Sequence, residues 1–202
     1  SGAGAAALAC IGLLVKLGLP RKNIWVTDIK GLVYEGRTEL MDPDKAVYAQ
    51  ATGQRTLAEA IDGADVFLGL SAGGVLKPEM VARMAARPLV FALANPIPEI
   101  TPEEVMKVRN DAIMATGRTD YPNQVNNVLC FPYIFRGALD CGATSITNSM
   151  EIAAVHAIAD LAQAEQNEEV AAAYAGQHLA FGPQYLIPKP FDPRLMLKIA
   201  PA

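Results

Sequence analysis

The sequence predicts an α/β fold in which a doubly wound parallel sheet has helices on both faces and a helical C-terminal segment follows. Two observations support this prediction. Short apolar runs alternate with segments of helix-forming residues, which is the pattern of βαβ units. These runs are almost continuously apolar, as strands are when both faces of a parallel sheet are covered. We therefore expect the 202 residues to form one domain with a helical extension from about residue 128.

Local signals locate the individual elements. The first helix is rich in Ala, Leu, Ile and Val and ends at Gly18-Leu19-Pro20. Pro43 suits a first helical turn, and Thr56-Leu57-Ala58-Glu59 has the spacing of a capping box. Thr101 precedes a proline at another helix start, and the Pro-rich residues 185–193 are expected to be extended. The expected strands are 24–28, 65–70, 89–94 and 112–116, and the expected helices are 3–17, 43–51, 78–86, 128–139, 147–164 and 168–174, with two more beginning at 56 and 101.

Composition narrows the function classes. Seventeen Lys and Arg against 21 Asp and Glu give a net charge of −4, so the chain has no cationic surplus for binding nucleic acid. The hydrophobic content of 51% excludes a disordered chain. Three cysteines without metal-ligand spacing indicate neither a disulfide framework nor a zinc site. Without a disulfide framework, a reduced, cytoplasmic setting is expected. The apolar stretch 2–15 is too short to cross a bilayer before Lys16, so we expect no membrane partner.

The chain opens with a nucleotide-binding pattern. Residues 2–7 match G-x-G-x-x-G/A, in which Gly2 permits a tight turn, Gly4 lets backbone approach a pyrophosphate and Ala7 allows close helix packing. A plain helix start could produce the same letters. Asp28 favours the nucleotide interpretation, because it ends the next predicted strand near the spacing of about 20 residues expected for a ribose-binding acid. The candidate dinucleotide contacts in the motif are Gly2, Ala3, Gly4, Ala5, Ala6 and Ala7.

The strand that normally leads into such a motif is missing, because the pattern begins at residue 2. A Rossmann-like sheet without its first, central strand would leave two neighbouring strands with unpaired backbone groups. We therefore expect the chain to be a fragment of a larger protein.

Cofactor choice stays open from these residues. Asp28 would repel a 2′-phosphate, which favours NAD. Lys30 and Arg37 follow it closely, and either could offset that repulsion and bind the phosphate of NADP.

Further candidates lie where predicted strands end, since ligands bind at the carboxyl ends of parallel strands. Ser71, Ala72 and Gly73 follow one strand, and Asn95 follows another. Each is also explained by an ordinary turn. The amide-rich segment 123–127 could orient a polar substrate or cap a helix. No arrangement of catalytic residues is evident, so we assign a catalytic role to none of them.

Longer motifs are similar to a known family. Residues 1–7, 25–37, 91–96 and 116–127 resemble the cofactor-binding domain of bacterial malic enzymes, particularly the large NADP-dependent type with a phosphotransacetylase-like domain downstream. The resemblance implies cofactor contacts at residues 2–7, Asp28, the Ser71 loop and Asn95. It implies substrate or nicotinamide contact at Asn127, with Asn126 as its neighbour, and it favours NADP over NAD.

The resemblance also implies what the rest of the enzyme supplies. In that family the acid Tyr, the base Lys and the ligands of Mg²⁺ or Mn²⁺ lie mostly in a preceding catalytic domain, so we assign no metal ligand here. Malate would be oxidised and decarboxylated to pyruvate, the intact enzyme is expected to be a homo-oligomer, and this chain alone is expected to be inactive. Two alternatives remain: the cofactor domain of another dehydrogenase or a malolactic-type enzyme, and a non-catalytic nucleotide-sensing module.

Overall fold

The computed structural model describes residues 1–164 and 180–202, so the expected helix at 168–174 lies outside the described residues. The described chain forms two compact units, Ser1–Arg118 and Thr119–Ala202. The helical extension expected from about residue 128 lies within the second unit.

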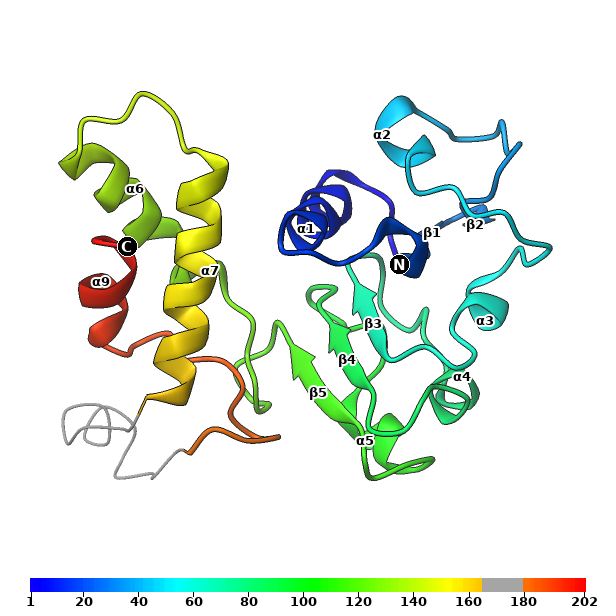
Figure 1. The fold of residues 1–202 in the computed structure, drawn as a ribbon. Coiled ribbons are helices and arrows are strands. Elements are labelled where there is room, and N and C mark those ends of the chain that lie inside the picture. The colour runs from blue at the N-terminus through cyan, green and yellow to red at the C-terminus, as the bar shows by residue number, and fades with distance from the viewer. Residues whose placement is uncertain (165–179) are drawn as a thin grey trace. The chain divides into compact units, whose positions relative to one another are not determined.

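A parallel sheet organises the first unit and confirms the predicted α/β class (Figure 1). Its strands are β3 (Val66–Gly69), β4 (Leu89–Ala92) and β5 (Ile113–Thr116), in that order. Gly69 pairs with Ala92, and Ala92 pairs with Thr116, so the three strands end level with one another. The loops that follow them therefore leave from one edge of the sheet, where parallel α/β folds bind ligands.

The helices of this unit begin largely where the sequence predicts. They are α1 (Ala5–Lys16), η1 (Arg21–Asn23), α2 (Pro43–Ala46), α3 (Leu57–Ala60), α4 (Pro78–Ala82) and α5 (Pro102–Met106). Both Thr56 and Thr101 form complete capping boxes with the glutamate three residues later. The helices after β3 and β4 contribute Val81 and Val105 to a core that also contains Val90 of the sheet, all at most 1% exposed.

The predicted strand at 24–28 is wrong in its extent and pairing. Only β1 (Thr27–Asp28) is a strand, and it pairs antiparallel with β2 (Gly31–Leu32) in a separate two-stranded sheet. Ile24 and Val26 contribute to a second core around α1, and this segment forms no ladder with β3. A groove lies between the two segments, at the position where the sequence predicts a missing strand.

Ser1 and Gly2 bridge one end of this groove. The Ser1 amine donates to the Leu68 carbonyl at 2.7 Å, the Leu70 amide donates to the Ser1 carbonyl at 3.0 Å, and the Gly2 amide donates to the Thr27 carbonyl at 2.8 Å. Ser1 and Gly2 therefore connect the segment of β3 to the segment of β1 by backbone hydrogen bonds.

The second unit is helical. It contains η2 (Asn127–Leu129), α6 (Phe131–Asp140), α7 (Asn148–Gln163) and α9 (Arg194–Ile199), which confirms the helices expected at 128–139 and 147–164. Leu129, Leu161 and Leu195 bring these elements together in one buried cluster. Gly137 packs directly on the backbone of Ala200, where a side chain would not fit.

Candidate functional site

The glycine turn places backbone amides at the start of α1. Gly2 has a φ of +88°, and a Cβ there would collide with the Leu70 carbonyl, so only glycine fits this turn. Gly4 is the residue before the helix; a Cβ on it would meet no atom within 4 Å, so its backbone is open to a ligand. Ala7 is buried against the unit, as the motif requires. The turn has the form that the sequence predicts.

Among the α-helices of this unit, α1 alone begins with neither a side-chain cap nor an acidic residue, because α4 has no side-chain cap but carries Glu79 in its first turn. Asp42, Thr56 and Thr101 cap α2, α3 and α5 with their side chains, and each of those helices carries an acid in its first turn. Helix α1 has neither a side-chain cap nor an acid there, and Ala5 and Ala6 are exposed. Amide groups and the positive end of the helix dipole are thus left to an external anion, for which a diphosphate is suitable.

Asp28 lies beside this turn in a buried ion cluster. Arg37 binds both of its carboxylate oxygens at 2.7 Å, Lys45 binds Oδ2 at 3.1 Å, and the Lys30 amide binds Oδ1 at 2.8 Å. The side chains of Asp28, Arg37 and Lys45 are only 11%, 3% and 9% exposed, respectively. Burial raises the pKa of Asp28, but the hydrogen bonds from Arg37, Lys30 and Lys45 outweigh it and hold the pKa below its ordinary value.

The candidate phosphate-binding cations differ in availability. Arg37 is fully engaged, because it also donates to the carbonyls of Gly31, Leu32 and Glu39. Lys30 is exposed and pairs with the Glu39 side chain at the surface. Lys45, which the sequence analysis did not single out, supplies a second charge to Asp28. The predicted helix start at Pro43 was the sequence feature nearest to Lys45, but the contact of Lys45 with Asp28 arises only in the folded chain.

The loops after β3 and β4 meet at the same edge. Ser71, Ala72 and Gly73 are exposed, and a Cβ on Gly73 would lie 2.8 Å from the side chain of Ile97. Asn95 is also exposed and precedes Pro96 through a cis peptide bond. The structure therefore brings Gly2, Asp28, Ser71 and Asn95 to one end of the unit, since Gly2 contacts Thr27 and Ser1 contacts Ser71.

Glu99 is a residue of this edge that sequence reasoning missed. Its side chain is fully buried and accepts hydrogen bonds from the Ser71 amide and hydroxyl and from the Ala94 amide. An acid enclosed by the apolar residues Ile97, Pro98 and Ile100 was the signal that could have found it.

Asn126 and Asn127 belong to the second unit. The Asn126 side-chain oxygen accepts from the Val128 amide and caps η2, so a ligand would meet its amide N–H groups. Asn127 is exposed at the start of η2. Nearby, buried Asn123 donates to the Pro183 carbonyl and accepts from the Leu186 amide, which fixes this amide-rich segment within the unit.

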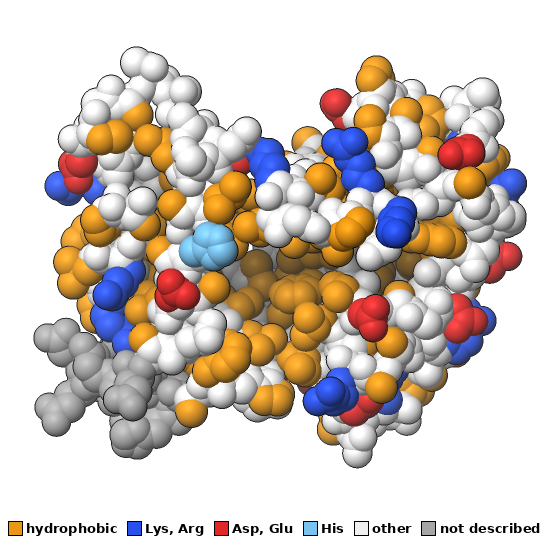
Figure 2. Space-filling view, viewed as in Figure 1, with side chains coloured by type: hydrophobic (Ala, Val, Ile, Leu, Met, Phe, Trp, Pro, Cys, Tyr) orange, Lys and Arg blue, Asp and Glu red, His pale blue; other side chains and the backbone are white. Residues whose placement is uncertain are grey.

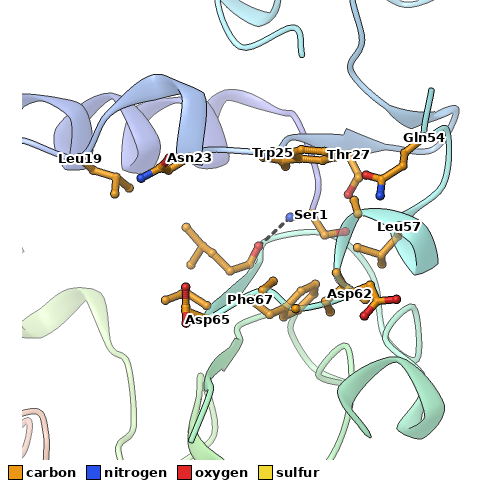
Figure 3. Close-up of a pocket in the computed structure, with 16 residues that line it drawn as sticks. Ser1, Leu19, Asn23, Trp25, Thr27, Gln54, Leu57, Asp62, Asp65 and Phe67 are labelled. Carbon is orange, nitrogen blue, oxygen red and sulfur yellow. Dashed lines mark hydrogen bonds between the residues drawn. The ribbon is translucent and has the colours of Figure 1, made fainter. Parts of the chain in front are cut away.

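The groove beside β3 is distinct from this candidate site. It forms a cavity of about 580 Å³ between Trp25 and Thr27 on one side and Asp65 and Phe67 on the other, with Ser1 at one end (Figure 3). Figure 2 shows the first unit hollowed beneath α1, with hydrophobic side chains in the hollow. The walls of this groove are the segments 25–27 and 65–68, which run alongside each other. The candidate nucleotide contacts lie beyond the carboxyl ends of these segments.

The described residues contain neither a metal-binding cluster nor a helix suited to a membrane. No group of three or more His, Cys, Asp or Glu side chains is placed to hold a metal ion within residues 1–164 and 180–202. In the same part of the chain, none of the helices combines the length and apolarity needed to cross a membrane.

Comparisons with known proteins agree with this geometry. Residues 1–174 match the family model described as "Malic enzyme, NAD binding domain". The chain is 66% identical over its whole length to an NAD-dependent malic enzyme of Rhizobium meliloti and 63% identical to an NADP-dependent malic enzyme of Salmonella typhimurium. It spans only 26% and 27% of those proteins.

A solved structure extends the likeness to the fold. The malic enzyme of Entamoeba histolytica superimposes with a TM-score of 0.83 at 37% identity, over 98% of this chain and 40% of that one. The family model covers most of the chain, including the glycine turn and the loops after the strands. The chain belongs to the malic enzyme family, as its NAD-binding domain.

Proposed function

We propose that this chain is the dinucleotide-binding part of an enzyme that converts malate to pyruvate and CO₂ with reduction of NADP. The observation that carries the proposal is the uncapped, acid-free start of α1 behind the Gly2 turn. Three of the other four α-helices in this unit have side-chain caps, and the fourth, α4, carries Glu79 in its first turn. Helix α1 has neither, which supports an external anion at its start.

NADP is preferred over NAD because of the charge around Asp28. A lone acid at this position would repel a 2′-phosphate, but Arg37 and Lys45 leave the buried cluster with a net charge of about +1. The carboxylate already accepts four hydrogen bonds, which is its full capacity of about four lone-pair sites. The ribose hydroxyls of NAD would therefore compete with Arg37 or Lys45 for the oxygens of Asp28. The 2′-phosphate of NADP would instead contact Lys30 at the surface.

The chain's contribution to the reaction is binding and orientation. When bound, the nicotinamide accepts the hydride from the carbinol carbon of malate. The turn at Gly2 holds the diphosphate, the exposed residues of the Ser71 loop and Asn95 contact the nicotinamide half, and Asn127 orients a malate carboxylate through hydrogen bonds. Orientation of this kind contributes several kcal/mol to lowering the barrier. The catalytic Tyr and Lys and the ligands of Mg²⁺ or Mn²⁺ belong to an upstream domain.

The remaining features of the intact protein are also proposals. The chain spans about a quarter of the two relatives named above, which supports a much longer polypeptide. We propose that this polypeptide has a catalytic domain upstream and a phosphotransacetylase-like domain downstream. We propose that this protein is a cytoplasmic homo-oligomer.

A substitution on α1 tests the anion site directly. Ala6→Glu places an acid in the exposed first turn, where it suits the helix dipole but opposes a diphosphate. We expect calorimetric titration of the full-length protein to show NADP⁺ binding weakened by about ten-fold or more, since charges a few ångströms apart interact by about 1–4 kcal/mol near a surface. Ala9→Glu, on the same helix but beyond its first turn, is the matched control and should bind normally.

Titration of the wild-type protein with NADP⁺, NAD⁺ and AMP sets the preference. Tighter binding of NAD⁺ than of NADP⁺ would refute the choice of NADP. Equal binding of NADP⁺ by the Ala6→Glu and Ala9→Glu variants would refute the anion site.

A further inference from the structure

Glu99 has the features of a group retained for its hydrogen bonds. Its side chain has no exposed surface, and burying a carboxylate is costly unless donors surround it. Oε1 accepts from the Ser71 amide at 2.8 Å and from the Ser71 hydroxyl at 3.0 Å, and Oε2 accepts from the Ala94 amide at 2.9 Å. The donors therefore divide between the two oxygens.

These donors come from two loops. Ser71 opens the loop after β3, and Ala94 directly precedes Asn95 in the loop after β4. The carboxylate thus joins the two segments that carry the candidate nicotinamide contacts. Neither segment is in a ladder with the other at this point, because the strands end at Gly69 and Ala92.

The surrounding backbone is shaped to admit this side chain. A Cβ on Gly69 would lie 2.5 Å from the Glu99 carboxyl carbon, so glycine at the end of β3 leaves the space that the carboxylate occupies. The Leu76 amide donates to the Glu99 carbonyl, and the Gly74 amide donates to the Pro98 carbonyl, both at 3.1 Å. The Ser71 loop therefore holds Glu99 at two places: Ser71 at its start binds the carboxylate, and Leu76 after it binds the backbone carbonyl.

The contact also orients Ser71. The Ser71 hydroxyl donates its proton to Glu99 Oε1, and Ser71 Oγ itself accepts a hydrogen bond from the Ser1 hydroxyl at 3.2 Å. Ser71 therefore meets a ligand as an acceptor, which suits a ribose hydroxyl or a carboxamide N–H.

We propose that Glu99 is a positioning residue whose buried carboxylate ties the loop after β3 to the loop after β4 and so fixes the nicotinamide half of the dinucleotide site. The inference rests on the proposed function, because it concerns the geometry of that site. It separates the nicotinamide half, which depends on Glu99, from the adenosine half, which depends on α1 and Asp28.

Glu99→Gln in the full-length protein tests this. A glutamine has the same shape but only one acceptor oxygen, so its NH₂ group must face either the Ser71 or the Ala94 amide and leave a buried donor unpaired. We expect the dissociation constant of NADP⁺ to rise about ten-fold or more, as misplaced contacts do, while that of adenosine 2′,5′-bisphosphate changes less than about two-fold. The turnover number with malate should fall as well, since the nicotinamide is misplaced.

Glu104→Gln is the matched control, because Glu104 belongs to the capping box of α5 and glutamine also serves there. Its two dissociation constants should match those of the wild type. Glu99→Asp keeps the charge but shortens the reach, and it provides the same comparison if the glutamine variant does not fold.

The outcomes separate the two claims. If the wild type binds neither nucleotide, the proposed function fails and this inference fails with it. If the wild type binds both and the Glu99 variants weaken both equally, or weaken neither, only the positioning role is overturned.

Discussion

The Asp28 cluster predicts a large loss of stability from a small change. Asp28→Asn keeps the shape of the side chain but removes the buried charge that contacts both Arg37 and Lys45, and leaves Lys45 only the half-exposed Asp42 at 4.0 Å. Those cations are 3% and 9% exposed, so solvent screens them poorly once the acid is gone. Removing one partner of a buried ion pair costs about 3–5 kcal/mol, and two cations then repel each other at the same place. We expect a loss in the unfolding free energy at the upper part of that range.

Within these 202 residues a single tryptophan makes an assay on this chain local. Trp25 is the one tryptophan of the sequence and lies in the same unit, three residues before Asp28. Urea unfolding followed by its fluorescence therefore reports on the part of the protein that contains the cluster. With a denaturant dependence of about 1–3 kcal/mol per molar urea, a loss of about 4 kcal/mol moves the midpoint down by about 1–4 M.

The control comes from the same loop. Glu39→Gln also removes one negative charge, but the Lys30–Glu39 pair is 47% and 63% exposed, and such surface pairs contribute little. Its midpoint should remain near that of the wild type. If Asp28→Asn lowers the midpoint no more than Glu39→Gln does, the two cations do not depend on the carboxylate and the reasoning is refuted.

Three further predictions use the same assays. The pKa of Asp28 is held below its ordinary value of 3.8, so the stabilisation by its carboxylate is complete above that value and is lost as the pH falls through the lowered pKa. The urea midpoints of the wild type and Asp28→Asn should therefore converge between about pH 5 and pH 2. A difference between the midpoints that grows on acidification would contradict this. Gly2→Ala places a Cβ on a residue with φ +88°, which strains the turn, so we expect NADP⁺ binding measured by calorimetry to weaken. An unchanged affinity would contradict this. Thr101→Ala removes a helix cap and should cost about 1 kcal/mol in urea unfolding with no change in NADP⁺ affinity, so a variant that loses affinity would show that the cap reaches the site.

Local signals predicted most of the helices and three of the strands. Capping boxes at Thr56 and Thr101 depend on residues three positions apart, and the structure confirms both. The strand at 24–28 was mispredicted because its pairing is set by the turn that directly follows it, which the apolar run does not show. Gly31 turns the backbone at φ +94° and lies against the carbonyl of Arg55, so Asp28 pairs with the segment directly after it.

The candidate site was predictable in its backbone part only. Gly2 and Gly4 act through their own conformation, which a short motif records. Asp28 was found by its spacing, but its partners were not, because Arg37 and Lys45 reach it only after the loop folds back. Asn126 and Asn127 were found as a cluster of amides, and their contact with a substrate stays a prediction.

Glu99 shows why the missed residues are those that hold the site together. Its hydrogen bonds reach Ser71, 28 positions away, and Ala94, five positions away, so no spacing in the sequence connects the three. A ligand-contacting residue carries its chemistry in its own side chain or backbone, whereas a residue that orients two loops has an effect only where the fold brings those loops together. The same holds for Arg37, whose charge suggested a phosphate contact but whose donors are all committed to Asp28 and nearby carbonyls. Side-chain chemistry alone therefore overstates which residues meet the cofactor, and counting each donor and acceptor in the folded chain separates ligand contacts from their supports.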